Sequence, residues 1–262
     1  MHRFLILLAL LGCTTTDPIP SRLETTPRHD EWVQIARGAR TLHAYVSYPE
    51  RSTKVPAVVV IHENRGLTDW VRTVADRLAE NGYIAIAPDL LSGMAPGGGR
   101  TSDFPSQDAA REGISKLPRD QVLADLHAAA DYVKALPSAN GTLSVGGFCW
   151  GGARTFDFAN ARNDLSGSFV FYGTGPQTED GVRNINAPVF GFYGGNDERV
   201  NATIAKTEEL MRAAGKRFEP VIYPGAGHAF LRSGEEANAA DANRVARDEA
   251  WKRWLALCCG QP

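Results

Sequence analysis

Short apolar runs alternate with helix-like segments through most of this 262-residue sequence. Residues 56–63 (PAVVVIHE) and 83–90 (YIAIAPDL) are almost continuously apolar, which is typical of strands buried on both faces of a sheet. Between them, residues 70–83 carry apolar side chains at helical spacing, with a glycine near the end. This order predicts an α/β fold: a mostly parallel central sheet with helices on both faces.

Further strands, helices and loops are predicted elsewhere along the chain. Residues 32–36 and 42–48 alternate around Gly38 as a β-hairpin would. The Gly- and Pro-rich residues 93–105 are predicted to be loop. No internal repeat or later shift in composition appears, so we expect one domain over residues 31–262. The remaining predicted strands are 142–148, 168–173, 187–195 and 217–225, and the remaining predicted helices are 120–136, 152–161, 202–215 and about 239–257.

The first residues resemble an export signal. Arg3 precedes an apolar stretch, residues 4–11, that is shorter than the roughly 20 residues needed to span a bilayer. The following LLGC resembles a bacterial lipobox, in which Cys13 is lipidated and becomes the mature N-terminus. We therefore expect a signal peptide over residues 1–12, a tether over 13–30, and a lipid-anchored protein of the bacterial cell envelope or periplasm. A plain cleaved signal or a disordered extension is the alternative.

Charge and cysteine content narrow the possible functions. The net charge is −2 and no basic run stands out, so we expect no nucleic-acid partner. The spacing of the 4 cysteines suggests neither a zinc site nor a disulfide framework. His62 and Glu63 are adjacent but lack a second pair of ligands at helical spacing, so no metal or cofactor is expected.

Four reactive side chains lie at or just after the ends of predicted strands: Glu63, Cys149, Asp197 and His228. In open α/β sheets, ligands bind beyond the carboxyl ends of the strands. Each residue alone has an ordinary alternative, such as a packed thiol, a turn aspartate, a surface histidine or a solvated carboxylate. Together, in the order nucleophile, acid, histidine, they favour a catalytic set.

The segment GGFCWGG, residues 146–152, places Cys149 between glycines at the junction of a predicted strand and helix. A nucleophile on such a tight turn needs small neighbours, and the helix N-terminus behind it favours a thiolate and an oxyanion, with the Trp150 N–H as one donor. A histidine can act as base, and an aspartate can fix its tautomer. An acyl-thioester intermediate would follow, and esters or lactones suit such a site better than amides.

The stretches HENRGL, IAPDLL, GGFCWGG, GGNDERVN and YPGAGHAF resemble the dienelactone hydrolase family, over nearly the whole chain after the expected tether. The resemblance implies an α/β-hydrolase fold without a metal. It also implies a triad of Cys149 as nucleophile, His228 as base and Asp197 as the residue that orients the base. Glu63 matches a family glutamate that holds the resting thiol and takes its proton. The Asn64 N–H matches the second oxyanion donor.

Substrate recognition is the least constrained property. In this family two arginines hold a substrate carboxylate; Arg232 matches one of them, and the alternative for Arg232 is a surface charge. Gly93 occupies the place of the other, for which Arg65 or Arg100 could substitute. The resemblance therefore implies a cofactor-free hydrolase of a small lactone or carboxylic ester, similar to carboxymethylenebutenolidase, and we expect the protein to be a monomer. A thioesterase or general carboxylesterase on the same triad, or a non-catalytic binding protein on the same fold, remains an alternative.

Overall fold

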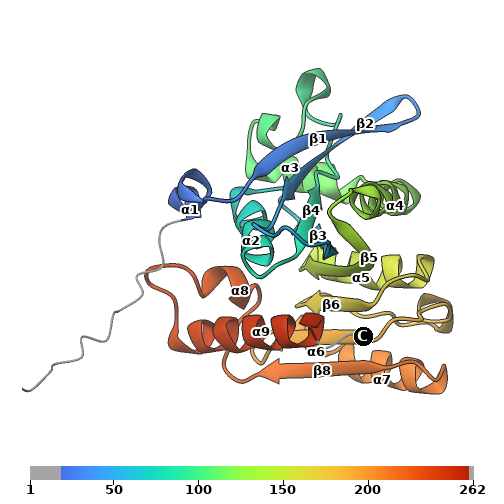
Figure 1. The fold of residues 1–262 in the computed structure, drawn as a ribbon. Coiled ribbons are helices and arrows are strands. Elements are labelled where there is room, and N and C mark those ends of the chain that lie inside the picture. The colour runs from blue at the N-terminus through green and yellow to red at the C-terminus, as the bar shows by residue number, and fades with distance from the viewer. Residues whose placement is uncertain (1–18, 260–262) are drawn as a thin grey trace, which may run out of the picture.

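The computed structural model describes residues 19–259 of the chain. These residues contain one mixed sheet of eight strands. The strands are β1 (Asp30–Arg37), β2 (Arg40–Ser47), β3 (Val55–Ile61), β4 (Ile84–Pro88), β5 (Ala139–Phe148), β6 (Gly167–Phe171), β7 (Val189–Gly194) and β8 (Phe218–Tyr223). Their spatial order is β1-β2-β4-β3-β5-β6-β7-β8. Strands β3 to β8 pair in parallel, whereas β2 is antiparallel to β1 and β4. Figure 1 shows the β1–β2 hairpin at one end of the sheet and β8 at the other.

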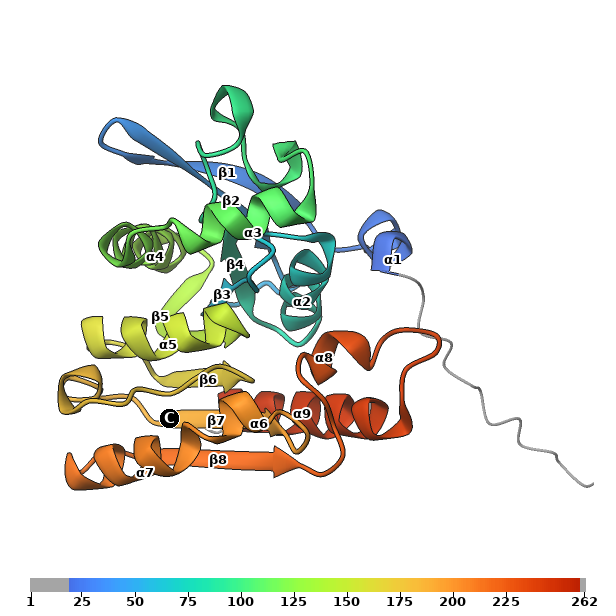
Figure 2. The same cartoon turned by 180° about the vertical axis from the view of Figure 1, so that it is seen from behind.

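Helices cover both faces of this sheet. Val58 and Val60 of β3 join a buried apolar cluster with residues of α2 (Asp69–Glu80), α8 (Phe230–Ser233) and α9 (Asp241–Cys259). Val59 and Ile61 join a second cluster with residues of α4 (Arg119–Ala135), α5 (Trp150–Ala161) and α7 (Ile204–Ala213). The two faces alternate because successive strand side chains point in opposite directions. Helix α9 lies in front of the sheet in Figure 1 and behind it in Figure 2. The helices are α1 (Ile19–Thr25), α2 (Asp69–Glu80), α3 (Gln107–Ser115), α4 (Arg119–Ala135), α5 (Trp150–Ala161), α6 (Glu198–Asn201), α7 (Ile204–Ala213), α8 (Phe230–Ser233) and α9 (Asp241–Cys259).

The predicted α/β fold class is confirmed, and so is the hairpin around Gly38, where β1 pairs with β2 from Asp30 to Ser47. The loop predicted for residues 93–105 contains two short 3-10 turns and is held by a buried aspartate. Asp89 accepts hydrogen bonds from the Thr101 N–H (2.8 Å), the Thr101 hydroxyl (2.7 Å) and the Leu91 N–H (3.1 Å). This loop is therefore tied to the end of β4.

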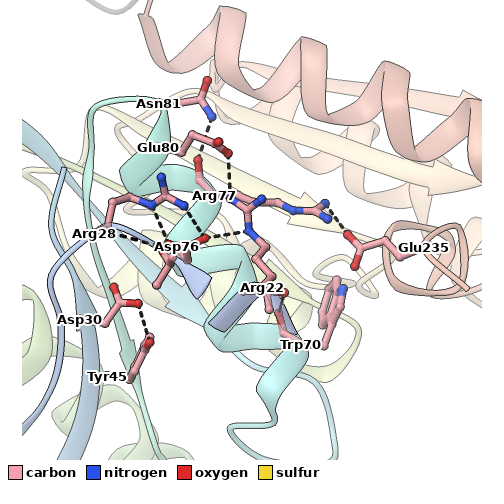
Figure 3. A network of polar contacts seen from close by, with 12 residues as sticks. Arg22, Arg28, Asp30, Tyr45, Trp70, Asp76, Arg77, Glu80, Asn81 and Glu235 are labelled. Carbon is pink, nitrogen blue, oxygen red and sulfur yellow. Dashed lines mark hydrogen bonds and ion pairs between the residues drawn. The ribbon is translucent and has the colours of Figure 1, made fainter. Parts of the chain in front are cut away.

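The expectation of a tether over residues 13–30 is corrected for its second half. There the chain forms α1 and then meets Asp76, a fully buried residue of α2. Arg28 donates two hydrogen bonds to the Asp76 carboxylate (2.6 and 2.9 Å), Thr26 donates one (2.6 Å), and Arg22 lies 2.7 Å away. Figure 3 shows both guanidinium groups converging on this carboxylate. The segment is ordered because a buried carboxylate must be compensated by such partners.

Most of the expectations about export and membrane anchoring concern residues that the structure does not describe. The expected signal peptide (residues 1–12) and Cys13 lie outside the described residues. Within residues 19–259, no helix combines the length and the apolar character needed to cross a membrane.

Candidate active site

Cys149 occupies a sharp turn between β5 and α5. Its backbone angles are φ 55° and ψ −115°, and its N–H donates to the carbonyl of Phe171 (3.0 Å). A Cβ on Gly147 would overlap the Gly151 carbonyl, and one on Gly151 would overlap the His62 carbonyl. Both positions therefore require glycine so that α5 can approach β3 and β5. A non-glycine residue with such backbone angles costs about 1–3 kcal/mol and is typically retained at functional sites.

His228 joins Cys149 to Asp197. Its Nε2 lies 3.1 Å from the Cys149 Sγ, and its Nδ1 lies 2.5 Å from Oδ2 of Asp197. The three residues follow β5, β7 and β8, so their meeting depends on the ends of separate parallel strands. The side chain of Asn243 on α9 also fixes the histidine loop, because its Oδ1 accepts from the Gly227 N–H (2.9 Å).

The environment of His228 favours its charged form. Burial alone would lower the pKa of the ring, but hydrogen bonds and charge interactions with Cys149 and Asp197 outweigh it and raise the pKa to about 9. Below that pH the ring donates to the sulfur through Nε2 and to Asp197 through Nδ1. Asp197 is 7% exposed, so this carboxylate is well placed to fix the orientation of the ring.

Glu63 is paired with Arg232 rather than with the thiol. Arg232 Nε on α8 donates to Glu63 Oε2 at 2.9 Å, and Glu63 is 4% exposed. The second carboxylate oxygen, Oε1, is buried without a hydrogen-bond partner among the described residues. The geometry thus places Cys149 against His228, while Glu63 neutralises the guanidinium that was expected to hold substrate.

Five of the predicted site residues line two separate hollows, whereas Asp197 and His228 line neither of these two. One, of about 450 Å³, contains Cys149, Trp150 and Asn64. Neither the Trp150 N–H nor the Asn64 N–H has an acceptor within residues 19–259, so both remain available as oxyanion donors. The other hollow, of about 500 Å³, is lined by Glu63, Arg65 and Arg232 together with residues 101–110 of the neighbouring loop and α3.

Of the three positions connected with a second substrate arginine, Arg65 lines the hollow of about 500 Å³, whereas Gly93 and Arg100 lie outside the walls of both hollows. Arg100 places its guanidinium over the ring of Trp32, 3.9 Å from the centroid. Gly93 has a φ of 77°, a backbone conformation that favours glycine. Its nearest potential side-chain neighbour is Arg40. Neither position therefore supplies a cation to the Cys149 hollow.

His62 holds the loop that carries Glu63 and Asn64, a role that the sequence analysis missed. Its ring is fully buried and stacks on Trp150, with the centroids 5.7 Å apart. Nδ1 lies 2.8 Å from the Glu63 carbonyl, and Nε2 accepts from the Leu90 N–H (3.3 Å). Because burial lowers the pKa of His62, the neutral ring with its proton on Nδ1 fits both bonds. The only sequence signal was its place at the end of a buried strand.

Tyr172 is the second residue that the sequence analysis missed. It directly follows β6, lines the Cys149 hollow, and packs edge-on against the ring of His228 at 5.2 Å. Its φ of 40° makes it, with Cys149 (55°) and Ala229 (59°), one of three non-glycine residues with positive φ among the described residues. All three flank or form the contact between Cys149 and His228. Backbone strain in this molecule is therefore concentrated at the candidate site.

Comparison with known proteins identifies the family of this chain. The sequence model of the dienelactone hydrolase family matches residues 42–258. The chain belongs to the dienelactone hydrolase family. A relative from Escherichia coli (strain K12), named as a carboxymethylenebutenolidase, is 34% identical over 260 residues, covering 91% of this chain and 90% of the relative. The carboxymethylenebutenolidase of Pseudomonas putida is 29% identical over 213 residues, covering 79% and 88% of the two chains.

A solved structure of a Klebsiella pneumoniae protein described as a dienelactone hydrolase matches this family member with a TM-score of 0.77 and 28% identity. The match covers 90% of this chain and all of that one. This dienelactone hydrolase family member therefore has the α/β-hydrolase fold, and it is a hydrolase of a family that acts on ester bonds.

Proposed function

We propose that this protein hydrolyses a small lactone or carboxylic ester through a Cys149-His228-Asp197 triad and an acyl-thioester intermediate. The observation that carries the proposal is the continuous contact from Sγ to Nε2 (3.1 Å) and from Nδ1 to the Asp197 carboxylate (2.5 Å). A thiol needs an adjacent base to act as a nucleophile, and the base needs a group that orients it. Cys149, His228 and Asp197 provide the nucleophile, the base and the orienting group in one continuous contact.

The first half-reaction transfers the acyl group to sulfur. The Cys149 thiolate attacks the ester carbonyl carbon, and the resulting oxyanion accepts hydrogen bonds from the N–H groups of Trp150 and Asn64. The carbon–oxygen bond to the leaving group then breaks, and the protonated His228 ring donates its Nε2 proton to the departing oxygen. The product is an alcohol, or in a lactone the freed hydroxyl or enol end of the same molecule.

The second half-reaction releases the acid. Neutral His228 accepts a proton from water, which attacks the thioester carbonyl carbon through the same oxyanion position. The carbon–sulfur bond breaks, the carboxylic acid leaves, and the thiolate and the protonated ring are restored. Asp197 stays ionised throughout and stabilises the charged ring.

Glu63 contributes at the start of the cycle in this proposal. The family resemblance makes it the acceptor of the proton that leaves the resting thiol before the attack, and the same proton returns to the sulfur after the acid has left. Its low exposure (4%) and its unpartnered Oε1 are compatible with that role. Arg232 would then keep Glu63 oriented through its other oxygen, Oε2.

The proposal is tested by comparing wild type with Cys149→Ala on an uncharged aryl ester and on a dienelactone. Loss of the nucleophile should lower kcat by about 1,000-fold or more. Cys258→Ala, which removes a thiol at the end of α9, is the matched control and should keep the wild-type rate. Mass spectrometry of His228→Ala treated with the aryl ester should reveal an acyl group on Cys149. Equal turnover by wild type and Cys149→Ala would exclude the triad.

A further inference from the structure

The loop that carries His228 has little rigidity of its own. Gly225, Ala226 and Gly227 directly precede the histidine, and two glycines in so short a segment leave the backbone many accessible conformations. The His228 side chain is 33% exposed, so packing encloses the ring only in part. Contacts from other parts of the chain must therefore fix the backbone that positions this ring.

Asn196 bonds this loop to the loop that carries the triad acid. It directly precedes Asp197, and its backbone N–H donates to the Ala226 carbonyl at 2.9 Å. Its side-chain Nδ2 donates to the Gly225 carbonyl at 3.0 Å. Because both bonds come from one residue, the loops of the acid and the base cannot move apart without breaking both.

Asn243 holds the same loop from α9. Its Oδ1 accepts from the Gly227 N–H at 2.9 Å, and its Nδ2 donates to the Ser233 Oγ at 3.1 Å. Both bonds leave the helix, so this side chain serves the loop rather than its own helix. It thereby joins the two ends of a segment that contains His228.

The contacts of His228 depend on its exact position. Its Nε2 is 3.1 Å from the Cys149 sulfur, and its Nδ1 is 2.5 Å from the Asp197 carboxylate. These two partners raise the pKa of His228 to about 9 although burial opposes the charge. Hydrogen bonds weaken steeply as their distance and angle depart from the optimum. A small shift of the loop would therefore weaken the contacts on which the proposed triad depends.

We propose that Asn196 and Asn243 are positioning residues, an asparagine clamp that holds the backbone before His228 and so keeps its Nε2 at bonding distance from the Cys149 sulfur. Neither asparagine lines the hollow that contains Cys149, so each acts through the position of His228. The proposal rests on the proposed function and adds two residues outside the triad to those that determine its rate.

The first measurement is turnover of p-nitrophenyl acetate. Asn243→Ala should lower kcat by about 10-fold or more, because even a small misplacement of a reacting group is costly. Asn196→Ala should lower kcat by about 3-fold, because its backbone N–H still holds the loop. Asn196→Ala leaves α9 intact, so it tests the clamp even if Asn243→Ala does not fold. Asn238→Ala is the matched control and should keep the wild-type rate, because this exposed side chain makes no hydrogen bond within residues 19–259.

The second measurement distinguishes positioning from a purely structural role. Nuclear magnetic resonance can follow the titration of the His228 ring, whose signal is assigned by its loss in His228→Ala. If the clamp maintains the contacts with Cys149 and Asp197, the pKa of His228 should be lower in Asn243→Ala than the wild-type value of about 9. Asn238→Ala should titrate as the wild type does.

The outcomes separate this inference from the proposed function. Cys149-dependent turnover with an unchanged kcat in both Asn196→Ala and Asn243→Ala would overturn the clamp alone. So would a lower kcat in these variants without any change in the titration of His228. Equal turnover by wild type and Cys149→Ala would overturn the proposed function itself.

Discussion

Arg232 Nε donates a 2.9 Å hydrogen bond to Glu63 Oε2, which joins α8 to the loop after β3 across 169 positions of sequence. Each residue therefore constrains the other. Glu63 is almost inaccessible to solvent, so this guanidinium is the partner that compensates the buried carboxylate. Arg232 in turn cannot offer its full charge to a ligand while the pair is intact.

The Glu63–Arg232 pair should be strongly coupled in stability. Arg232→Gln leaves a buried carboxylate without its cation and should lower the free energy of unfolding by about 2–4 kcal/mol. Adding Glu63→Gln should recover much of that loss, because the uncompensated charge is then removed. Urea unfolding of the two single variants and the double variant measures the coupling. Losses that simply add would contradict it.

The raised pKa of His228 predicts a specific pH dependence of stability. Its pKa is about 9 in the folded protein and about 6.5 when unperturbed, so between these values the folded state binds more protons than the unfolded state. The resulting stabilisation is complete below about pH 6.5 and is lost as the pH rises through 9. Thermal unfolding should show Tm decreasing over this window. The decrease should be smaller in Asp197→Asn, and an identical slope in both proteins would refute the assignment to His228.

The glycine at position 151 should tolerate no side chain. A Cβ there would overlap the carbonyl groups of His62 and Ile61, which are backbone atoms at the end of β3. Gly151→Ala should therefore move α5 away from the sheet, cost about 1–3 kcal/mol of stability and lower kcat. Gly167→Ala is the control, because a Cβ at that position meets only aromatic side chains at 3.3 Å or more. Full activity of Gly151→Ala would contradict this account of the turn.

The sequence predicted the turn at Cys149 and the buried strands well because both leave local patterns in the sequence. The glycines around Cys149 are adjacent in sequence, and buried strands leave continuous apolar runs. Helix α3 was missed because it has few apolar positions, with Ala110 and Ile114 as its buried hydrophobic residues, and follows a Gly- and Pro-rich loop.

Asp76 should be a major determinant of stability. Burial opposes its charge, but hydrogen bonds from Arg28 and Thr26 and the charge of Arg22 lower its pKa below 3.8. The stabilisation is therefore present above about pH 4 and is lost as the pH falls through the folded pKa. Asp76→Asn should lower the free energy of unfolding by about 2 kcal/mol. Lys206→Ala, which breaks an exposed pair with Glu209, should cost less than about 0.5 kcal/mol. Urea unfolding near pH 7 compares them, and equal losses would contradict the role of Asp76.

The N-terminus of the mature protein tests the expected anchor. If residues 1–12 are a lipoprotein signal, mass spectrometry of the membrane-extracted protein should show a chain that begins at Cys13 with a lipid mass added. Cys13→Ala should lack that mass and leave the membrane fraction. A free amine at another cleavage site would exclude lipidation.

Local sequence patterns could not predict the polar pairs that join residues far apart in the sequence. Arg28 and Asp76 are separated by 48 positions, and Glu63 and Arg232 by 169. Nothing near either residue of such a pair indicates its partner, since the two meet only when α2 or α8 packs on the sheet. The expectation of a tether over residues 13–30 had the same origin: the Thr- and Pro-rich composition was visible, but the buried carboxylate that orders its second half was not.

The contacts of Arg22 and Arg28 with Asp76 determine how far the chain can be shortened from its N-terminal side without loss of stability. The family match begins at residue 42, downstream of both arginines. A protease that trimmed the chain to that boundary would remove the edge strand β1 and leave Asp76 buried without its two cations. A shortened chain that keeps these contacts must therefore begin at or before Arg22, so the family boundary underestimates the smallest stable form of this enzyme.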